Sequence, residues 1–567
     1  MDRTVIHIVI ITVASLVIGG STGWAQSLNR ELQELGIEYF AWRASTQPCG
    51  PDDIPRIERT DGWLPEYSAS AIDTIRLKYS DFRDRLDNLP KDGWSRADSV
   101  DYLLLRSAIE RVHWEIDVLR LPYKNPEFYV QQTLGSVYEL LFPSTEMNSR
   151  RLKEIVRRLN HIPATVRAAE QNLTDPVRPF AEIAIRDLEG ARKRLAELVA
   201  SLKPVCDSQT FEELDRGARI AADSLDAYGE WLREILPSLG EDFGIGSRAY
   251  KYFIRNIALI PWAPEEMLQA GRSEFDRAVT FEQIERVRNA ALPPSKLFAT
   301  AREQIEQAKK DEASIRKFLI DRKLLTIPSW IQHYRTRLVP PYVQAFAGVG
   351  EMDDLTSASR LNEDGTAYIP PPSPRLSYFR KASAQDPRPI TIHEGVPGHY
   401  FQLAVSWSHP DPIRRHYFDS GSNEGWAFYA EEMMLQAGLF DRDRPQAREI
   451  IYNFMRLRAL RVEVDIQLAL GEFTIPQAGE YLASRVPMDT GTAMVEAAFF
   501  AATPGQAITY QIGKLQIQKF LSDARKVQAD QFDLRAFHDY LVRNGNVPIA
   551  LLRWEYLGLD DEIEKLW

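Results

Sequence analysis

Two histidines six residues apart, His393 and His399, enclose a proline and a glycine, and this spacing limits the local fold more than any other feature of the chain. An α-helix turns about 100° per residue, so six residues leave the two side chains roughly 120° out of alignment. Pro397 has no N–H to donate to the carbonyl of His393, and Gly398 tolerates unusual backbone angles. The sequence therefore predicts a distorted turn that brings His399 back toward His393.

The side chains around this turn are those that a zinc hydrolase needs. Such a site has three protein ligands, an open position for water, and a carboxylate that takes a proton from that water. His393 and His399 supply two imidazoles, Glu424 supplies a third ligand, and Glu394 is placed to act as the base. We therefore predict a Zn²⁺ site, although Mn²⁺ or Co²⁺ would suit the same donors.

A helix is predicted from Asn423 to Leu435, and it carries a second carboxylate on the face of the proposed ligand. Glu424, Phe428 and Glu431 recur at helical spacing on that face. From there Glu431 can orient a ligating imidazole through the ring nitrogen that faces away from the metal.

Four motifs in the second half of the chain belong together. They are His393-Glu-Gly-Val-Pro-Gly-His-Tyr-Phe-Gln402, Glu424-Gly-Trp-Ala-Phe-Tyr-Ala-Glu431, Arg458-Ala-Leu-Arg461 with Asp465, and Pro504-Gly-Gln-Ala507 leading into Tyr510 and Gly513. In these motifs, and more loosely from Gly244 to the C-terminus, the chain resembles the bacterial domain-of-unknown-function family 885, which is grouped with the zincin-like metallopeptidases that take a glutamate as third zinc ligand. The resemblance implies a metallopeptidase-like fold and site. Tyr400 stands where many relatives have a second histidine, which leaves His399 as the only candidate for the second ligand.

Peptide hydrolysis also needs a donor for the oxyanion that develops on the carbonyl. Tyr510 is the candidate, with packing between helices as an equal alternative. The cluster of Arg456, Arg458 and Arg461 could bind a substrate carboxylate. Because Asp465 lies four residues after Arg461, an ion pair within one helix explains Arg461 better.

The histidines also have a plainer explanation, because most histidines are hydrogen-bonded core or surface groups. Clustering favours the metal site: of nine histidines, four gather at His393, His399, His409 and His416. The last two lie beside prolines in the segment that connects the motifs, so we expect them to be solvent-exposed.

The N-terminus resembles a cleavable signal sequence. An almost wholly apolar run from Val5 to Gly20 is followed by Ser-Thr-Gly-Trp-Ala25, with small residues where a signal peptidase reads. We expect a secreted or periplasmic protein without a stable membrane anchor after cleavage; the alternative is an uncleaved anchor, for which the run is short. No cysteine follows the run, which argues against lipid attachment. Cys49 and Cys206 could form a disulfide in an oxidising compartment or remain two thiols.

Composition fits a large globular enzyme, with 567 residues of which 44% are hydrophobic, and a net charge of -11 excludes nucleic acid as a plausible partner. Most of the chain has helical periodicity, clearest in the apolar stripe from Ala218 to Ile235. Further helices are predicted over 27–45, 72–86, 95–119, 149–169, 179–202, 264–282, 300–318 and 444–470. Short extended pieces at 366–369, 376–380 and 390–392 could form a small sheet beside the zinc-site helix, where it could bind substrate backbone.

We therefore expect a mainly α, large helical zincin-like metallopeptidase fold with a small β-sheet. It would comprise a signal peptide (1–25), a helical N-terminal region (26–243) that walls the cleft, and a zincin-like catalytic region (244–567). The expected function is zinc-dependent hydrolysis of peptide bonds in short peptides. Two alternatives remain open: a non-catalytic metal-binding or scaffold protein of the same fold, and a zinc hydrolase of non-peptide amides or esters.

Overall fold

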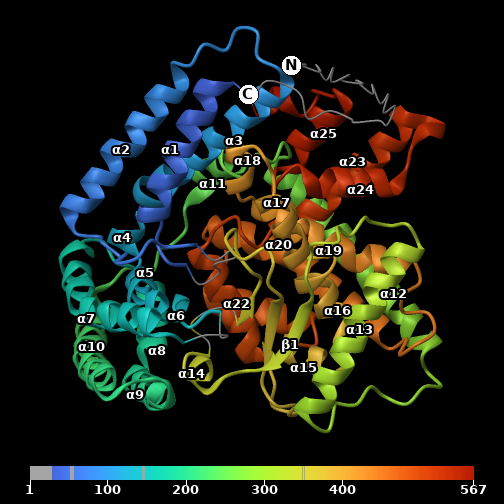
Figure 1. The fold of residues 1–567 in the computed structure, drawn as a ribbon. Coiled ribbons are helices and arrows are strands. Elements are labelled where there is room, and N and C mark those ends of the chain that lie inside the picture. Colours follow the sequence, from blue (N-terminus) through green and yellow to red (C-terminus); the bar gives the residue numbers. More distant parts are fainter. Residues whose placement is uncertain (1–28, 51–56, 144–146, 348, 350–351, 567) are drawn as a thin grey trace, which may run out of the picture.

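The computed structural model describes residues 29–50, 57–143, 147–347, 349 and 352–566 (Figure 1). The predicted signal peptide, 1–25, lies outside these residues. The described chain is mainly helical and contains one small three-stranded sheet, as expected. In the part of the chain that is described, no helix is both long enough and apolar enough to cross a membrane.

The N-terminal helices form an arc along one side of the molecule, drawn in blue to teal in Figure 1. The predicted helix over 179–202 is interrupted, because Gly190 has a φ of 73° and separates α8 from α9. The helix predicted on the apolar stripe at 218–235 begins ten residues earlier, at Ser208, and the other helices predicted here are confirmed to within a few residues. Ser95 with Asp98 forms a capping box at the start of α3. The elements are α1 (Arg30–Thr46), α2 (Ala69–Asp87), α3 (Arg96–His113), the π-helical turn η1 (Trp114–Val118), α4 (Leu121–Lys124), α5 (Pro126–Val130), the π-helical turn η2 (Gln131–Gly135), α6 (Ser136–Glu139), α7 (Ser149–Asn172), α8 (Arg178–Leu188), α9 (Ala191–Leu202) and α10 (Ser208–Ile235).

The rest of the chain places its motif-bearing helices at the centre of the molecule, where α17, α19 and α20 lie (Figure 1). The elements are α11 (Gly246–Asn256), α12 (Pro264–Arg288), α13 (Ala301–Asp321), β1 (Tyr334–Leu338), α14 (Pro341–Gln344), β2 (Asp353–Asp354), β3 (Gly365–Ile369), α15 (Tyr378–Gln385), α16 (Arg388–Ile390), the π-helical turn η5 (Thr391–Gly395), α17 (His399–Trp407), α18 (Pro412–His416), α19 (Ser420–Gln436), α20 (Ala447–Ala469), α21 (Ile475–Arg485), α22 (Thr490–Ala502), α23 (Thr509–Gln528), α24 (Leu534–Arg543) and α25 (Ile549–Leu557).

The small sheet has the order β1-β3-β2, with β1 parallel and β2 antiparallel to β3. Of the three extended pieces expected, only 366–369 is a strand. The piece at 376–380 enters α15, and 390–392 is helical, with its apolar Ile392 buried in the core. The sheet does lie beside the histidine segment, because a Cβ on Gly395 would meet the ring of Tyr334 on β1.

Helix α19 is buried along nearly its whole length, from Gly421 to Leu435. It packs against α17 and α23, and the largest core cluster extends from Leu32 to Leu566, so both predicted regions contribute to it. Each buried carboxylate on α19 needs a partner, since a buried charge is costly unless it is paired. Glu432 has one in Lys514, at 2.9 Å; the other two, Glu424 and Glu431, face the histidines.

Candidate metal centre

The segment between His393 and His399 reverses direction as the sequence predicts. His393 lies in the π-helical turn η5, Val396 is extended, and α17 begins at His399. Gly398 makes the turn possible, because a Cβ there would overlap the carbonyl oxygen of His393. The two imidazole rings consequently lie 4.7 Å apart between centroids, at an angle of 80°.

Three buried side chains converge at this turn. The Nε2 atoms of His393 and His399 each lie 3.3 Å from the same carboxylate oxygen, Oε2 of Glu424. Tetrahedral ligands about 2.0 to 2.1 Å from a zinc ion are about 3.4 Å from one another, so both separations match the edge of a zinc coordination tetrahedron. Oε2 of Glu424 takes part in no hydrogen bond with any residue that the structure describes. The donor set therefore fits a zinc ion.

The charge of Glu424 also suits a ligand. Burial opposes ionisation of this carboxyl, but His399 and His393 beside it outweigh burial and hold the pKa of Glu424 well below its usual range. The three side chains therefore offer two imidazole nitrogens and one carboxylate anion.

Glu431 occupies the position predicted for a residue that orients a ligand. Its Oε1 lies 2.7 Å from Nδ1 of His393 and 3.0 Å from Nη2 of Arg458, and all three side chains are buried. A carboxylate at Nδ1 favours the tautomer with its proton on that atom, which leaves the lone pair of Nε2 toward Glu424.

The arginine cluster does not have the partners expected from sequence. Arg456 donates to Glu282 at 2.6 Å, Arg458 faces Glu431, and Arg461 donates through Nε to Glu496 at 2.9 Å. The ion pair predicted between Arg461 and Asp465 is therefore wrong.

Asp465 has a different role, because it accepts hydrogen bonds from the backbone amides of Gly505 and Ala507. These amides are buried in the turn before α23, so they need an acceptor of this kind. None of the three arginines is left available for a substrate carboxylate.

Tyr510 lies beside the candidate ligands. Its ring is nearly parallel to that of His393, with the centroids 6.4 Å apart, and the guanidinium of Arg461 lies 4.5 Å from its centroid. The close crossing of α23 and α19 sets this position. A Cβ on Gly425 of α19 would lie 2.6 Å from the backbone of Gly513 of α23, so the two helices touch through their main chains.

Glu394 is the one residue between Thr391 and His399 that is not fully buried. Its charge acts on the hydroxyl of Tyr334, which places the carboxylate on the β1 side of the site. Glu394 is thus partly exposed to solvent, whereas its neighbours are buried.

His409 and His416 are not ligands, and they differ from each other. His416 is exposed as expected, but the prediction of an exposed His409 is wrong: this residue is buried and accepts a hydrogen bond from the amide of Asp411. Cys49 and Cys206 are free thiols.

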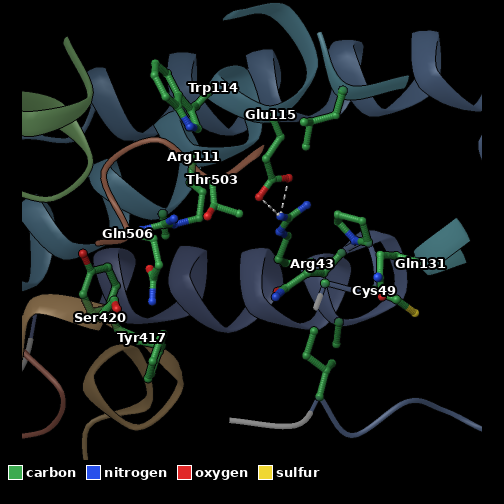
Figure 2. Close-up of a pocket in the computed structure, with 18 of the residues that line it drawn as sticks. Arg43, Cys49, Arg111, Trp114, Glu115, Gln131, Tyr417, Ser420, Thr503 and Gln506 are labelled. Carbon is green, nitrogen blue, oxygen red and sulfur yellow. Dashed lines mark hydrogen bonds and ion pairs between the residues drawn. The ribbon is translucent and has the colours of Figure 1, made fainter. Parts of the chain in front are cut away.

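A cavity of about 660 Å³ lies between the N-terminal helices and the motif-bearing helices (Figure 2). The ligand cluster does not line it, yet the two adjoin: Ser420 and Gln506 line the cavity, four residues before Glu424 and Tyr510 respectively. Ser420 and Glu424 are about 6 Å apart along the axis of α19. The opposite wall includes Arg43, Arg111 and Glu115. The sequence carried no signal for these three, because only long-range packing brings the N-terminal helices here.

Comparison with known proteins gives one family and a shared fold. A family model described as "Bacterial protein of unknown function (DUF885)" matches residues 51–555, so the likeness begins well ahead of Gly244. No curated protein matches the sequence significantly.

Two similar solved structures are each described as that of a "putative lipoprotein". The protein from Shewanella oneidensis, described as of unknown function, is 16% identical, with a TM-score of 0.71 over 93% of this chain and 99% of that one. The protein from Colwellia psychrerythraea is 18% identical, with a TM-score of 0.75 over 93% and 98%. At these identities the likeness establishes the fold.

Proposed function

The chain belongs to the DUF885 family of bacterial proteins, and we propose that this member is a zinc-dependent peptidase that hydrolyses short peptides. The proposal is carried by one observation: two imidazole nitrogens each lie 3.3 Å from a single carboxylate oxygen that has no hydrogen-bond partner among the described residues. A buried carboxylate oxygen that two imidazole nitrogens approach in this way is typical of shared coordination to one metal ion, which supports the proposal.

When bound by His393, His399 and Glu424, zinc would supply a Lewis acid that polarises a carbonyl and lowers the pKa of water. The chain's own residues would do the rest. Glu394, which keeps solvent access beside His393, accepts a proton from the attacking water. It then returns that proton to the leaving amine as the carbon–nitrogen bond breaks.

Two further side chains support this reaction. The hydroxyl of Tyr510 donates to the oxyanion that forms on the carbonyl, and Glu431 keeps the ring of His393 in one tautomer. The burial of the ligands excludes bulk water, which strengthens these electrostatic interactions.

We further propose that the protein is exported. Residues 5–20 form an almost wholly apolar run ahead of small residues that suit a signal peptidase. The two similar structures are each described as that of a "putative lipoprotein", which agrees with a location in the cell envelope or beyond it.

The proposed function is tested by elemental analysis of the purified mature protein beside the His399→Ala variant. Both proteins are then incubated with a mixed peptide library. About one zinc per chain in the wild type, lost in the variant together with cleavage, is the expected result. A wild type that takes up no metal when zinc is supplied would overturn the proposal. If the protein binds zinc but cleaves only esters or non-peptide amides, those compounds and not peptides are its substrates.

A further inference from the structure

Among the charged residues that line the cavity, Arg111 differs from the others in its contacts. Arg43 and Glu115 neutralise each other through two contacts of 2.6 Å, Glu127 accepts a hydrogen bond from Gln131 at 2.6 Å, and Glu58 accepts from Ser359. The guanidinium of Arg111, on α3, makes no hydrogen bond or ion pair with any residue that the structure describes. A half-buried guanidinium without a partner is available for an anionic ligand.

Arg111 lies at the end of the cavity that adjoins the metal centre. Figure 2 shows it close to Thr503 and Gln506, on the opposite side from Cys49 and Gln131. Its charge acts on the carboxyl of Asp419, the N-cap of α19. Asp419 precedes Glu424 by five residues, which is about 7.5 Å along the helix axis.

We propose that Arg111 binds the free C-terminal carboxylate of a peptide whose chain runs from the cavity to the metal centre. This inference rests on the proposed peptidase function and adds the end of the substrate that the protein recognises. A guanidinium matches a carboxylate in both charge and planar geometry, and the two can form paired hydrogen bonds.

The opposite orientation, with the substrate's N-terminal ammonium at this end of the cavity, would bring that ammonium against the like charge of Arg111. Glu115 is neutralised by Arg43, and burial raises the pKa of Glu127 to about 7, which reduces its negative charge.

The size of the cavity fits a short C-terminal fragment. A volume of about 660 Å³ lies within the usual range for small-ligand sites.

The test compares zinc-loaded wild type with Arg111→Met, Arg111→Lys and Arg216→Met. Arg216 is exposed on α10 and serves as the matched control. The substrates are randomised pentapeptides without Asp or Glu, prepared as free acids and as C-terminal amides. KM and kcat are then measured for the best-cleaved sequence in both forms.

We expect the wild type and Arg216→Met to favour the free acid over the amide by a KM ratio of about ten to one hundred. Arg111→Met should raise the KM of the free acid to that of the amide and leave kcat within about twofold, and Arg111→Lys should restore part of the preference. Equal KM values for acid and amide in the wild type would overturn the inference, as would an unchanged preference in a folded Arg111→Met protein.

Calorimetric binding of the same peptides to the Glu394→Gln variant separates this inference from the proposed function. Tighter binding of free acids that disappears with Arg111→Met, in a protein that cleaves nothing, would remove the peptidase proposal and leave the carboxylate site intact. Cleavage without any preference for the free acid would remove the carboxylate site and leave the peptidase proposal intact. An amide with an internal Glu that binds as tightly as the free acid would overturn recognition of the terminus.

Discussion

Gly425 of α19 and Gly513 of α23 meet backbone to backbone where the two helices cross. Glu424 and Tyr510 lie next to this crossing, one on each helix, so the contact fixes the distance between a candidate zinc ligand and a candidate oxyanion donor. The site thus depends on two residues that carry no functional group.

Replacing Gly513 with Ala should separate the two helices. The added Cβ would overlap the backbone around Gly421, and overpacking of this kind costs about 1 to 3 kcal/mol. We expect a lower melting temperature together with weaker zinc binding, measured by calorimetry and by chelator competition. Gly240→Ala is the control, because nothing lies within 4 Å of a Cβ at that position. An unchanged zinc affinity in Gly513→Ala would show that the crossing does not control the site.

The Glu394→Gln variant should keep zinc and lose turnover. The substitution preserves shape but removes the proton acceptor, and general-base catalysis contributes about 10²- to 10⁴-fold. Elemental analysis and peptide cleavage by the same sample check both halves of the prediction. Full activity in the variant would assign the base to another residue.

Glu431→Gln should weaken zinc binding without removing a ligand. Loss of the negative charge beside Nδ1 of His393 relaxes the tautomer and the orientation of the ring, and such changes cost about 10- to 100-fold in metal affinity. Competition with a chelator measures the effect, with Glu424→Ala as the reference for loss of a true ligand. Equal losses in the two variants would mean that Glu431 itself binds the metal.

Asp419 should make the stability of the protein depend on pH between about 4 and 7. Burial raises the pKa of this carboxyl to about 7, against about 3.9 in an unfolded chain, while Arg111 opposes the shift. In this window the native state holds a proton that the unfolded state has released, so the free energy of unfolding falls as pH rises, by at most about 1.4 kcal/mol per pH unit.

The variant Asp419→Asn isolates this effect, because asparagine caps a helix as well as aspartate does. Urea unfolding of both proteins from pH 4 to pH 7 should show the wild type losing stability relative to the variant. Parallel curves would mean that Asp419 is ionised throughout.

The helices and the histidine turn could be predicted because their signals are local. Apolar residues at helical spacing predicted α19 to within a few residues and the C-terminal end of α10, and Pro397 with Gly398 predicted the turn. The first ten residues of α10 precede the apolar stripe and were missed. The strands gave weaker signals: the piece at 366–369 was predicted and lies in β3, but β1 is Tyr-Arg-Thr-Arg-Leu, with two arginines among its five residues, and β2 has two residues.

The partners of buried charges depend on packing rather than on spacing. Arg461 and Asp465 have the separation of a helical ion pair, yet Glu496 on α22 and the amides of the turn at 505–507 are closer to them in the folded chain. Arg111 could not be predicted for the same reason, since its place in the cavity requires the N-terminal helices to be docked.

The turn between the histidines affects how related sequences are identified. Because the carbonyl of His393 fills the space where a Cβ would stand on Gly398, no other amino acid fits there. We expect a homologue in which this glycine is replaced to lose the turn, even if it retains both histidines and the glutamate. A pattern search that fixes the histidines at a spacing of four would miss the motif altogether. The glycine is therefore as informative as the two histidines when homologues are compared for this turn.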